Sequence, residues 1–250
     1  MNKQKRGTLR IGTSGIVVPG TKLSFPPAFQ DKSRLYFYSS LFNTLEVNSS
    51  FYKIPMTKTF EKWSNEVDES FQFTIKLWRE ITHTKKLEID LDNIDKFLKA
   101  ADLLGNKKGC LLVQFPGKIT LEYYNQVEQI LERIVASNYQ WRIAVEFRNA
   151  SWYVGEVYEM LDEYGASLAL HDIPKGKNLE VNKGAKFVYV RFHGPRGDYR
   201  GGYDNIILKE WSKRMEGWLD DNKDVYAYFN NTMGLAFENA MTLKSLARKR

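Results

Sequence analysis

The amino-acid sequence predicts a single α/β domain of the (β/α)8 class, the TIM barrel. Eight segments show the two-residue alternation or short apolar run typical of strands, and helical spacing or room for a helix follows each of them. Polar residues gather where these strands end. A length of 250 residues suits one such barrel, so we expect one domain over 1–250 with an ordered barrel over about 9–240.

The expected strands follow one another along the whole chain. They lie at 9–15, 44–50, 71–77, 110–116, 166–172, 186–193 and 225–231, with a further strand at the start of 142–152. An open doubly wound sheet is the alternative fold. However, Gly12-Thr13-Ser14-Gly15 lacks the glycine fingerprint that the first turn of such a sheet requires.

The fifth expected strand shows the plan most clearly. Ile143 and Val145 lie on one face, whereas Glu146 and Arg148 lie on or near the end of the other. Ser151 then offers an N-cap for the next helix. A strand therefore delivers two opposite charges to its carboxyl end and turns into a helix.

Helix signals occupy the segments between the strands. The clearest helix is expected at 92–104, with Asp92 as its cap and Gly105 as its stop. Thr57 is expected to cap the helix after the second strand. Further helical patterns lie at 31–42 and 120–136, before Gly165, around 207–218 and after Gly234.

The composition indicates a globular protein with a large core, because 43% of its residues are hydrophobic. The single cysteine, Cys110, cannot form an internal disulfide, which fits a reducing compartment. No apolar stretch is long enough to span a membrane, and no signal-peptide pattern opens the chain. We therefore expect a soluble, cytoplasmic protein without a membrane partner.

The net charge of +7 arises partly from the two ends of the chain. The basic ends, 1–7 and 244–250, are expected to be solvated and flexible. The alternative interpretation is that the excess charge attracts nucleic acid or another polyanion.

Polar residues at the strand ends indicate where a functional site would lie, since TIM barrels carry their active sites at the carboxyl ends of the strands. These residues are Ser14, Glu46, Asn48, Lys76, Gln114, Glu146, Arg148, Asp172, Arg191, His193, Asn230 and Asn231. Several share the register opposite the β-branched face and are expected inside the barrel. Ionisable groups placed there must pair, bind water or bind a ligand.

Seven motifs in chain order carry a family resemblance. They are Gly12-Thr-Ser-Gly15, Leu45-Glu-Val-Asn-Ser-Ser-Phe-Tyr52, Phe71-Gln-Phe-Thr-Ile-Lys76, Val113-Gln-Phe-Pro116, Ala144-Val-Glu-Phe-Arg148 with Ser151-Trp152, Tyr189-Val-Arg-Phe-His-Gly194 and Phe229-Asn-Asn231. Together they resemble the YecE-like family, domain of unknown function 72, from about Leu9 to Ala240. The resemblance implies a TIM barrel and no particular activity.

Motif matching also assigns the family's characteristic polar residues to this chain. They are Glu46, Asn48, Lys76, Gln114, Glu146, Arg148, Asp172, Arg191 and His193. One segment departs from the family pattern. Ile16-Val-Val-Pro-Gly20 stands where family members typically carry an aromatic segment with Trp, so the contacts of the first loop are expected to differ.

The first candidate for catalysis is a pair of carboxylates. Glu46 and Glu146 lie on opposite sides of the expected barrel and could act as acid and base, as in glycoside hydrolysis. His193 would then shuttle protons, oriented by Asp172. The alternative is purely structural ion pairs, with Arg148 or Arg191 as the partner of Glu146 and Lys76 as the partner of Glu46.

A divalent metal is a second possibility for the same residues. The oxygen-rich set of Glu46, Glu146, Asp172 and His193 would suit Mg²⁺ or Mn²⁺ better than Zn²⁺. However, the chain has only three histidines, and nearby lysine and arginine side chains would repel a cation. We therefore expect no bound metal and keep a metal site as the alternative.

The loop after the seventh expected strand predicts an anion site, because phosphate often binds there in TIM barrels. Its glycines allow close approach of backbone N–H groups, and its arginines can clamp an anion. The predicted phosphate-binding residues are Gly194, Arg196, Gly197 and Arg200, with Asn230 and Asn231 as further donors. The alternative is a flexible, solvated loop.

The other strand-end groups are expected to bind substrate. Asn48 and Gln114 would form hydrogen bonds, and the charges of Lys76, Arg148 and Arg191 would hold an anion or a developing oxyanion. Aromatic residues that follow strand ends could line the mouth: Tyr52 and Trp152 above all, with Phe51, Trp78, Tyr199 and Tyr203. A Schiff-base role for Lys76 is the alternative to its pairing with Glu46.

These observations favour an enzyme that performs acid/base chemistry on an anionic small molecule, phosphorylated or derived from a nucleotide. Two rival functions remain open. One is a divalent-metal-dependent phosphodiesterase or nuclease. The other is a non-catalytic protein that binds nucleic acid or a metabolite. Hydrolase, lyase and isomerase reactions are not distinguished by the sequence.

Overall fold

The computed structural model describes residues 6–248 and shows an α/β fold built on parallel strands. Its strands form two sheets, ordered β1-β9-β8-β7 and β2-β3-β4-β5-β6. The first sheet contains β1 (Leu9–Thr13), β9 (Asp224–Phe229), β8 (Phe187–Phe192) and β7 (Leu170–His171). The second contains β2 (Thr44–Val47), β3 (Gln72–Lys76), β4 (Lys108–Phe115), β5 (Arg142–Phe147) and β6 (Ser167–Leu168).

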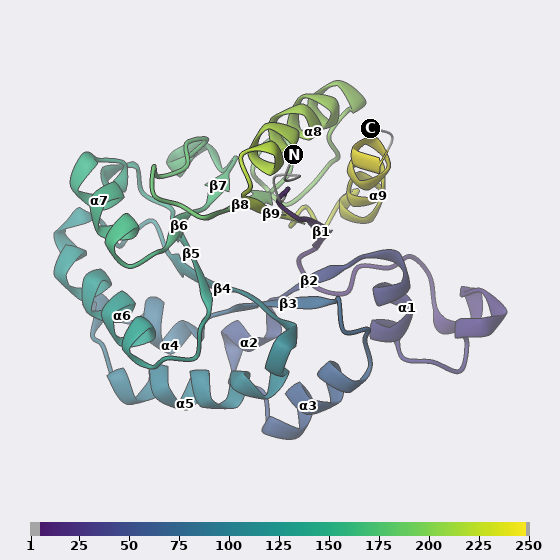
Figure 1. Ribbon diagram of the computed structural model, residues 1–250, viewed down its shortest axis with the longest axis horizontal. Helices are drawn as coiled ribbons and strands as arrows, with labels where there is room; N and C mark the ends of the chain where they lie inside the picture. Colours follow the sequence, from purple (N-terminus) through teal and green to yellow (C-terminus); the bar gives the residue numbers. More distant parts are fainter. Residues whose placement is uncertain (1–5, 249–250) are drawn as a thin grey trace, which may run out of the picture.

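Helices cover the outer faces of both sheets. They are α1 (Arg34–Leu41), α2 (Ser49–Tyr52), α3 (Thr57–Asn65), α4 (Arg79–Thr82), α5 (Leu91–Ala101), α6 (Tyr124–Ala136), α7 (Gly155–Glu163), α8 (Asn205–Asp220) and α9 (Ala236–Arg248). In Figure 1, α3, α5, α6 and α7 lie outside the β2–β6 sheet, whereas α8 and α9 lie beside β1, β8 and β9. The segment between β1 and α1 projects from the body at the right and exposes Leu23.

A closed eight-stranded barrel, which we expected, is not confirmed, because the strands divide into two sheets. The sheets approach each other at two seams. At one seam Ser14 bridges to Glu46, and the Gly15 N–H donates to the Glu46 carbonyl at 2.8 Å. At the other, the expected strand 166–172 is interrupted at Ala169, which separates β6 from β7.

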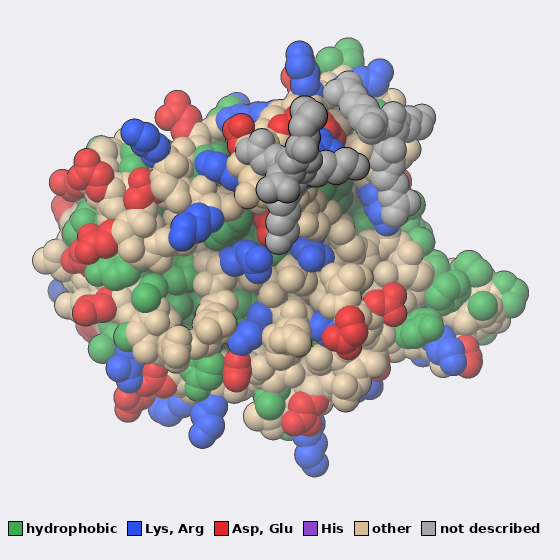
Figure 2. Space-filling model, in the orientation of Figure 1, with side chains coloured by type: hydrophobic (Ala, Val, Ile, Leu, Met, Phe, Trp, Pro, Cys, Tyr) green, Lys and Arg blue, Asp and Glu red, His purple; other side chains and the backbone are tan. Residues whose placement is uncertain are grey.

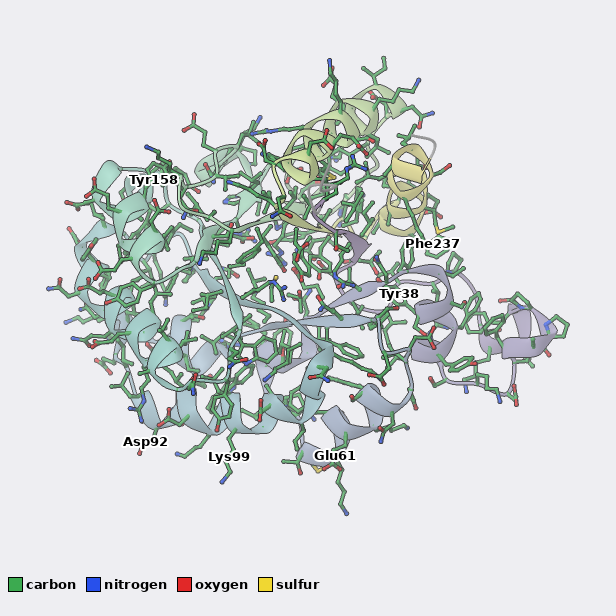
Figure 3. The ribbon with its side chains drawn as sticks, viewed as in Figure 1. Tyr38, Glu61, Asp92, Lys99, Tyr158 and Phe237 are labelled. Carbon is green, nitrogen blue, oxygen red and sulfur yellow. The ribbon has the colours of Figure 1, made fainter. Side chains whose placement is uncertain are left out.

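A buried tyrosine ties the first seam together. Tyr38 extends from α1 towards the sheets (Figure 3), and its hydroxyl accepts the Thr13 N–H at 2.8 Å. The same hydroxyl donates to the Thr44 carbonyl at 3.1 Å. Gly12 leaves the space for this contact, since a Cβ added there would lie 2.3 Å from the Thr44 carbonyl oxygen. The β1–β2 seam therefore depends on a residue without a side chain.

The space between the sheets is filled by aromatic and polar side chains. The Tyr228 hydroxyl lies 2.6 Å from Thr44 Oγ1 and 2.7 Å from Thr74 Oγ1, and the Tyr226 hydroxyl donates to Gln72 at 2.7 Å. Each buried hydroxyl is thus satisfied within the protein, as burial requires. The predicted register is confirmed, because the β-branched residues of these strands pack in the larger cluster shared with the helices.

Three predicted N-caps are wrong, although the helices they belong to form. Asp90, not Asp92, accepts the first-turn N–H of α5, at 3.0 Å. Asp92 points outward at the lower edge of the molecule in Figure 3. Thr57 is already the first residue of α3, and Ser151 lies inside the short turn Ala150–Trp152. The N-cap positions of α3 and α5 therefore lie one and two residues earlier than expected, at Met56 and Asp90, whereas that of α7 lies later, at Val154.

The described parts of both chain ends contact the body of the protein. Arg6 pairs with Asp220 at 2.9 Å, and the Gly7 N–H donates to the Leu219 carbonyl at 2.9 Å. At the other end, α9 continues to residue 248. The remaining terminal residues, 1–5 and 249–250, lie outside the described part of the chain. No helix within 6–248 is long and apolar enough to cross a membrane.

The β1–β2 seam yields a stability prediction. Gly12→Ala should destabilise the protein by about 1–3 kcal/mol, because the new methyl group overlaps a backbone carbonyl that cannot turn away. Gly217→Ala is the matched control. Gly217 lies inside α8 with no heavy atom near its added Cβ, so this change should stabilise by about 0.5–1 kcal/mol. Urea unfolding of both variants measures the difference, and equal effects would contradict the tight seam.

Candidate functional site

A buried arginine between two glutamates forms the centre of the site. Glu46, Glu146 and Arg191 are each the penultimate residue of a strand, in β2, β5 and β8 respectively. Arg191 holds Glu46 through two nitrogens, at 2.9 and 2.8 Å, and reaches Glu146 with its third nitrogen at 2.8 Å. All three side chains are at most 1% exposed. One guanidinium from the first sheet thus joins two carboxylates of the second sheet.

Additional hydrogen bonds complete the environment of Glu46. Ser14 donates to its Oε1 at 2.5 Å, and Tyr189 donates to its Oε2. Burial alone would raise the pKa of Glu46, but the charge and hydrogen bonds of Arg191 hold it below its ordinary value of 4.5. This carboxylate is therefore ionised, and both of its oxygens accept hydrogen bonds from other side chains.

Glu146 is ionised for the same reason. Burial opposes its charge, yet Arg148 and Arg191 together hold its pKa well below 4.5. Neither glutamate can supply a proton near neutral pH, so the geometry does not support the predicted acid/base pair. The ion-pair alternative describes the arrangement, with one correction: the partner of Glu46 is Arg191, not Lys76.

A second chain of contacts reaches Arg148 from the opposite direction. His193 Nδ1 lies 3.2 Å from Asp172 Oδ1, and its Nε2 lies 3.1 Å from Arg148 Nη2. Because a guanidinium can only donate, Nε2 accepts and Nδ1 carries the proton. Burial lowers the pKa of His193 to about 4, so the ring is neutral. His193 therefore orients Arg148, and both of its ring nitrogens contact other side chains.

Asp172 anchors this second chain. Burial would raise its pKa, but the hydrogen bonds from His193 and Tyr203 keep it below the ordinary value of 3.8. The backbone N–H of His193 adds a bond at 2.8 Å. Asp172 is thus an ionised support for His193, as predicted, within a fixed network.

A pocket of about 180 Å³ opens above these ion pairs, at the carboxyl ends of the strands. We call it the mouth pocket. Its lining residues are Asn48, Phe51, Tyr52, Lys76, Gln114, Arg148, Arg191, Tyr199 and Asn230. Asn48 Oδ1 is buried and has no hydrogen-bond partner within the described residues. The structure therefore gathers most of the predicted substrate-binding residues in one cavity.

Lys76 differs from the other cations of the mouth pocket. It makes no ion pair within residues 6–248, and its ammonium lies 3.9 Å from the centroid of the Phe51 ring. Burial and the nearby charge of Arg191 lower its pKa from 10.5 to about 7. Lys76 is thus the group of the pocket whose protonation changes near neutral pH.

His83 is a neighbour that sequence reasoning placed outside the site. Its ring lies 4.8 Å from Phe51, the ring that Lys76 also contacts. Burial and the charge of Lys76 lower the pKa of His83 to about 4. After β3 the chain turns back through α4 and brings His83 to the ring of Phe51. No residue pattern in the sequence predicts that turn.

Two predicted ligand contacts are instead structural. Trp152 is fully buried, stacks on Phe147 at 4.2 Å and donates its indole N–H to Ile119. Asn231 is also buried, and its amide donates to the Gly201 carbonyl at 2.9 Å. Neither lines the mouth pocket, because each faces the packing around it.

In the predicted phosphate loop, backbone N–H groups donate hydrogen bonds to other groups of the same loop. The Gly194 N–H donates to the Tyr203 hydroxyl at 2.6 Å, and the Gly197 N–H donates to the Gly194 carbonyl at 2.8 Å. Arg196 turns outward to Asp198 at 3.1 Å, with 78% of its side chain exposed. Arg200 is exposed as well. The loop therefore does not form the expected phosphate cradle.

What this loop contributes is a tyrosine. Tyr199 adopts a positive φ of 65°, its N–H donates to the His193 carbonyl, and its ring lines the mouth pocket. Its hydroxyl lies 3.4 Å from Arg148 Nη1. The backbone bend at Tyr199 thus brings the side chain back over the ion pairs.

The residues proposed as alternative metal ligands do not fit a metal. Arg191 occupies the space between Glu46 and Glu146, and both nitrogens of His193 face other protein groups. No group of three or more His, Cys, Asp or Glu side chains within 6–248 is arranged to hold a metal ion.

An apolar cavity adjoins the mouth pocket at Asn48. It measures about 250 Å³ and is lined by Gly15, Ile16, Leu35, Leu45, Val47, Asn48, Ser49 and Trp63. Ile16 belongs to the segment that departs from the family pattern. The unusual first loop therefore faces this neighbouring cavity.

Fold and site together define an α/β protein with a polar pocket at the carboxyl ends of parallel strands. The chain belongs to the family described as protein of unknown function DUF72, which matches residues 10–250. The resemblance expected from the motifs is thereby confirmed. The chain is also similar to UPF0759 protein YunF of Bacillus subtilis (strain 168), with 29% identity and 84% of each chain covered.

Two solved structures share the fold. A DUF72 family protein from Enterococcus faecalis is 22% identical, with a TM-score of 0.78 over 98% of this chain and 99% of that chain. A DUF72 family protein from Thermotoga maritima is 24% identical, with a TM-score of 0.76 over 96% and 99% of the two chains. At this identity the likeness establishes the architecture alone.

Removal of the central arginine should be costly. Arg191→Met is expected to destabilise the protein by about 3–5 kcal/mol at neutral pH, because it leaves two buried carboxylates without their shared partner. The surface variant Arg133→Met, which breaks the exposed ion pair with Asp95, should destabilise the protein far less. Denaturant unfolding of both variants tests the comparison.

The pH dependence gives an independent check of the same network. In the wild type, the stability contributed by ionised Glu46 and Glu146 is complete above the ordinary carboxyl pKa of 4.5 and is lost as the pH falls below it. Without Arg191 both carboxyls take up protons more readily. The deficit of Arg191→Met should therefore shrink towards acid pH. A constant deficit would contradict the network.

Proposed function

We propose that this protein is an enzyme that binds a small anionic molecule in the mouth pocket and transfers protons there. The observation that carries the proposal is the lining of the pocket. Its charged residues, Lys76, Arg148 and Arg191, are all cationic, while the carboxylates that balance them lie beneath, buried. We further propose that the two sheets act together as one barrel wall around this site.

Arg148 is best suited to hold the anion. Its Nε pairs with Glu146 and one terminal nitrogen faces His193, so the plane of the guanidinium is fixed. The other terminal nitrogen has only a long contact of 3.4 Å with Tyr199 and retains donors for a ligand. The amides of Asn48, Gln114 and Asn230 can complete the hydrogen bonding.

Proton transfer is better assigned to Lys76 than to the glutamates. An acid/base group works best when its pKa lies near the working pH. The pKa of Lys76 is lowered to about 7, whereas those of Glu46 and Glu146 are lowered from 4.5. This assignment leaves the glutamates to fix the arginines.

The rival functions have less support. A metal-dependent phosphodiesterase would need ligands that Arg191 now occupies. A polyanion would need a continuous basic surface. Outside the grey atoms, the face in Figure 2 mixes Lys and Arg with Asp and Glu instead. A non-catalytic metabolite-binding protein stays distinguishable only by the absence of turnover.

Anion binding should depend on the pocket and not on the exposed loop. We expect Arg148→Gln to weaken binding of small anions such as glycerol 3-phosphate or lactate by about 10- to 100-fold, since a charged hydrogen-bond donor is lost. Arg196→Gln removes an equal charge from the outward-facing loop and should change affinity less than about 2-fold. Calorimetry on both variants measures the effect.

Two outcomes would oppose this assignment. If Arg196→Gln weakened binding as much as Arg148→Gln, the loop would be the anion site after all. If neither change mattered and affinity for single-stranded nucleic acid fell steeply with salt, the polyanion interpretation would replace ours. Near-ultraviolet circular dichroism confirms that each variant keeps its tertiary structure.

A further inference from the structure

Lys76 carries an amine at the end of a strand whose alternate side chains point into the interior. Along β3, Gln72 and Thr74 reach the hydroxyls of Tyr226 and Tyr228 between the sheets. Lys76 follows on the same face, two residues further on, where the mouth pocket opens. The strand therefore fixes the base of the lysine side chain and leaves its amine facing the cavity.

The surroundings of this amine disfavour its protonated form. The carboxylates that could neutralise it are engaged elsewhere: Glu46 with Arg191, and Glu146 with both Arg191 and Arg148. Its nitrogen also lies 3.9 Å from the centroid of the Phe51 ring, a cation–π contact that favours the charged form. Burial of the amine and the neighbouring arginines act the other way, and these two conditions favour the neutral, nucleophilic form of a lysine.

A plain anion would be held better by a fully charged lysine. Because this site keeps its lysine close to neutrality, the arrangement suits chemistry that uses the lone pair of the amine. Arg148 meanwhile remains available for the charge of the ligand. The two side chains line the same pocket, so a single small molecule can contact both.

We propose that Lys76 forms an imine with a small aldehyde or ketone that carries a carboxylate or phosphate group. This inference rests on the proposed function and names its substrate class. Arg148 binds the anionic group, and the side-chain amides of Asn48 and Gln114 are the polar groups available to the carbonyl oxygen.

The bond changes balance without a further reactant. The lone pair of Lys76 Nζ attacks the carbonyl carbon, a C–N bond forms, and the carbonyl oxygen takes up a proton as one leaves the nitrogen. The C–O bond of this carbinolamine then breaks, and the oxygen leaves as water with the second amine proton. The products are an imine and one water molecule, and protonation by solvent gives the iminium ion.

Reductive trapping tests the proposal. The purified full-length protein is incubated separately with glyoxylate, pyruvate and dihydroxyacetone phosphate in the presence of cyanoborohydride, which reduces an iminium to a stable secondary amine. We expect one adduct per chain, located at Lys76 by peptide mass analysis. Which compound reacts separates carboxylate from phosphate recognition. The initial rate should rise with pH up to about pH 7, as the amine loses its proton.

Two lysine variants make the result decisive. Lys76→Arg should abolish the adduct, while Lys118→Arg, an exposed residue, should leave it unchanged. The proposal is overturned by labelling spread over surface lysines, by an adduct that persists in Lys76→Arg, or by no adduct with any of the three compounds. Lactate and glycerol 3-phosphate, which lack a carbonyl, separate the two levels of inference. If they bind while trapping fails, anion binding stands and the imine does not.

Discussion

The structure depends on one guanidinium shared by two buried carboxylates. Glu46 comes from the second sheet, as does Glu146, and Arg191 reaches both from the first sheet. Removing three charges from water is expensive, so this arrangement exists only because each charge is met by others. The same contacts hold the two sheets in register at the level where the pocket opens, so the stability of the fold and the shape of the site have a common cause.

The buried network separates the residues that support the site from the one that can exchange a proton. Glu46 and Glu146 stay ionised and hold the arginines, and the Asp172–His193 pair fixes Arg148 from the other side. Such rigid supports reduce the reorganisation that a bound charge would otherwise demand. Lys76 makes no ion pair within residues 6–248, and burial lowers its pKa to about 7. The pocket therefore combines ion pairs that keep their charges with one amine, Lys76, that can gain or lose a proton.

Much of this could be predicted from the sequence, because strand periodicity is a local property. Alternation placed Glu46, Glu146 and Arg191 at interior strand ends, and the structure brings them together. Which charges pair could not be predicted, since pairing depends on how far each side chain reaches across the interior. For that reason Lys76 was given Glu46 as a partner that Arg191 in fact takes. The loop 194–203 misled for a related reason: its glycines and arginines suggest free donors, whereas its N–H groups bond within the loop.

An NMR titration would show directly whether Lys76 changes its protonation near neutral pH, with lysine labelled at its ε-carbon and the resonance assigned by its loss in Lys76→Arg. We expect this one lysine to titrate near pH 7, well apart from the ordinary lysine value of 10.5. If the resonance of Lys76 moved with the others above about pH 10, the amine would be an ordinary charged lysine. The distinction between the buried ion pairs, which keep their charges, and a titrating Lys76 would then be wrong.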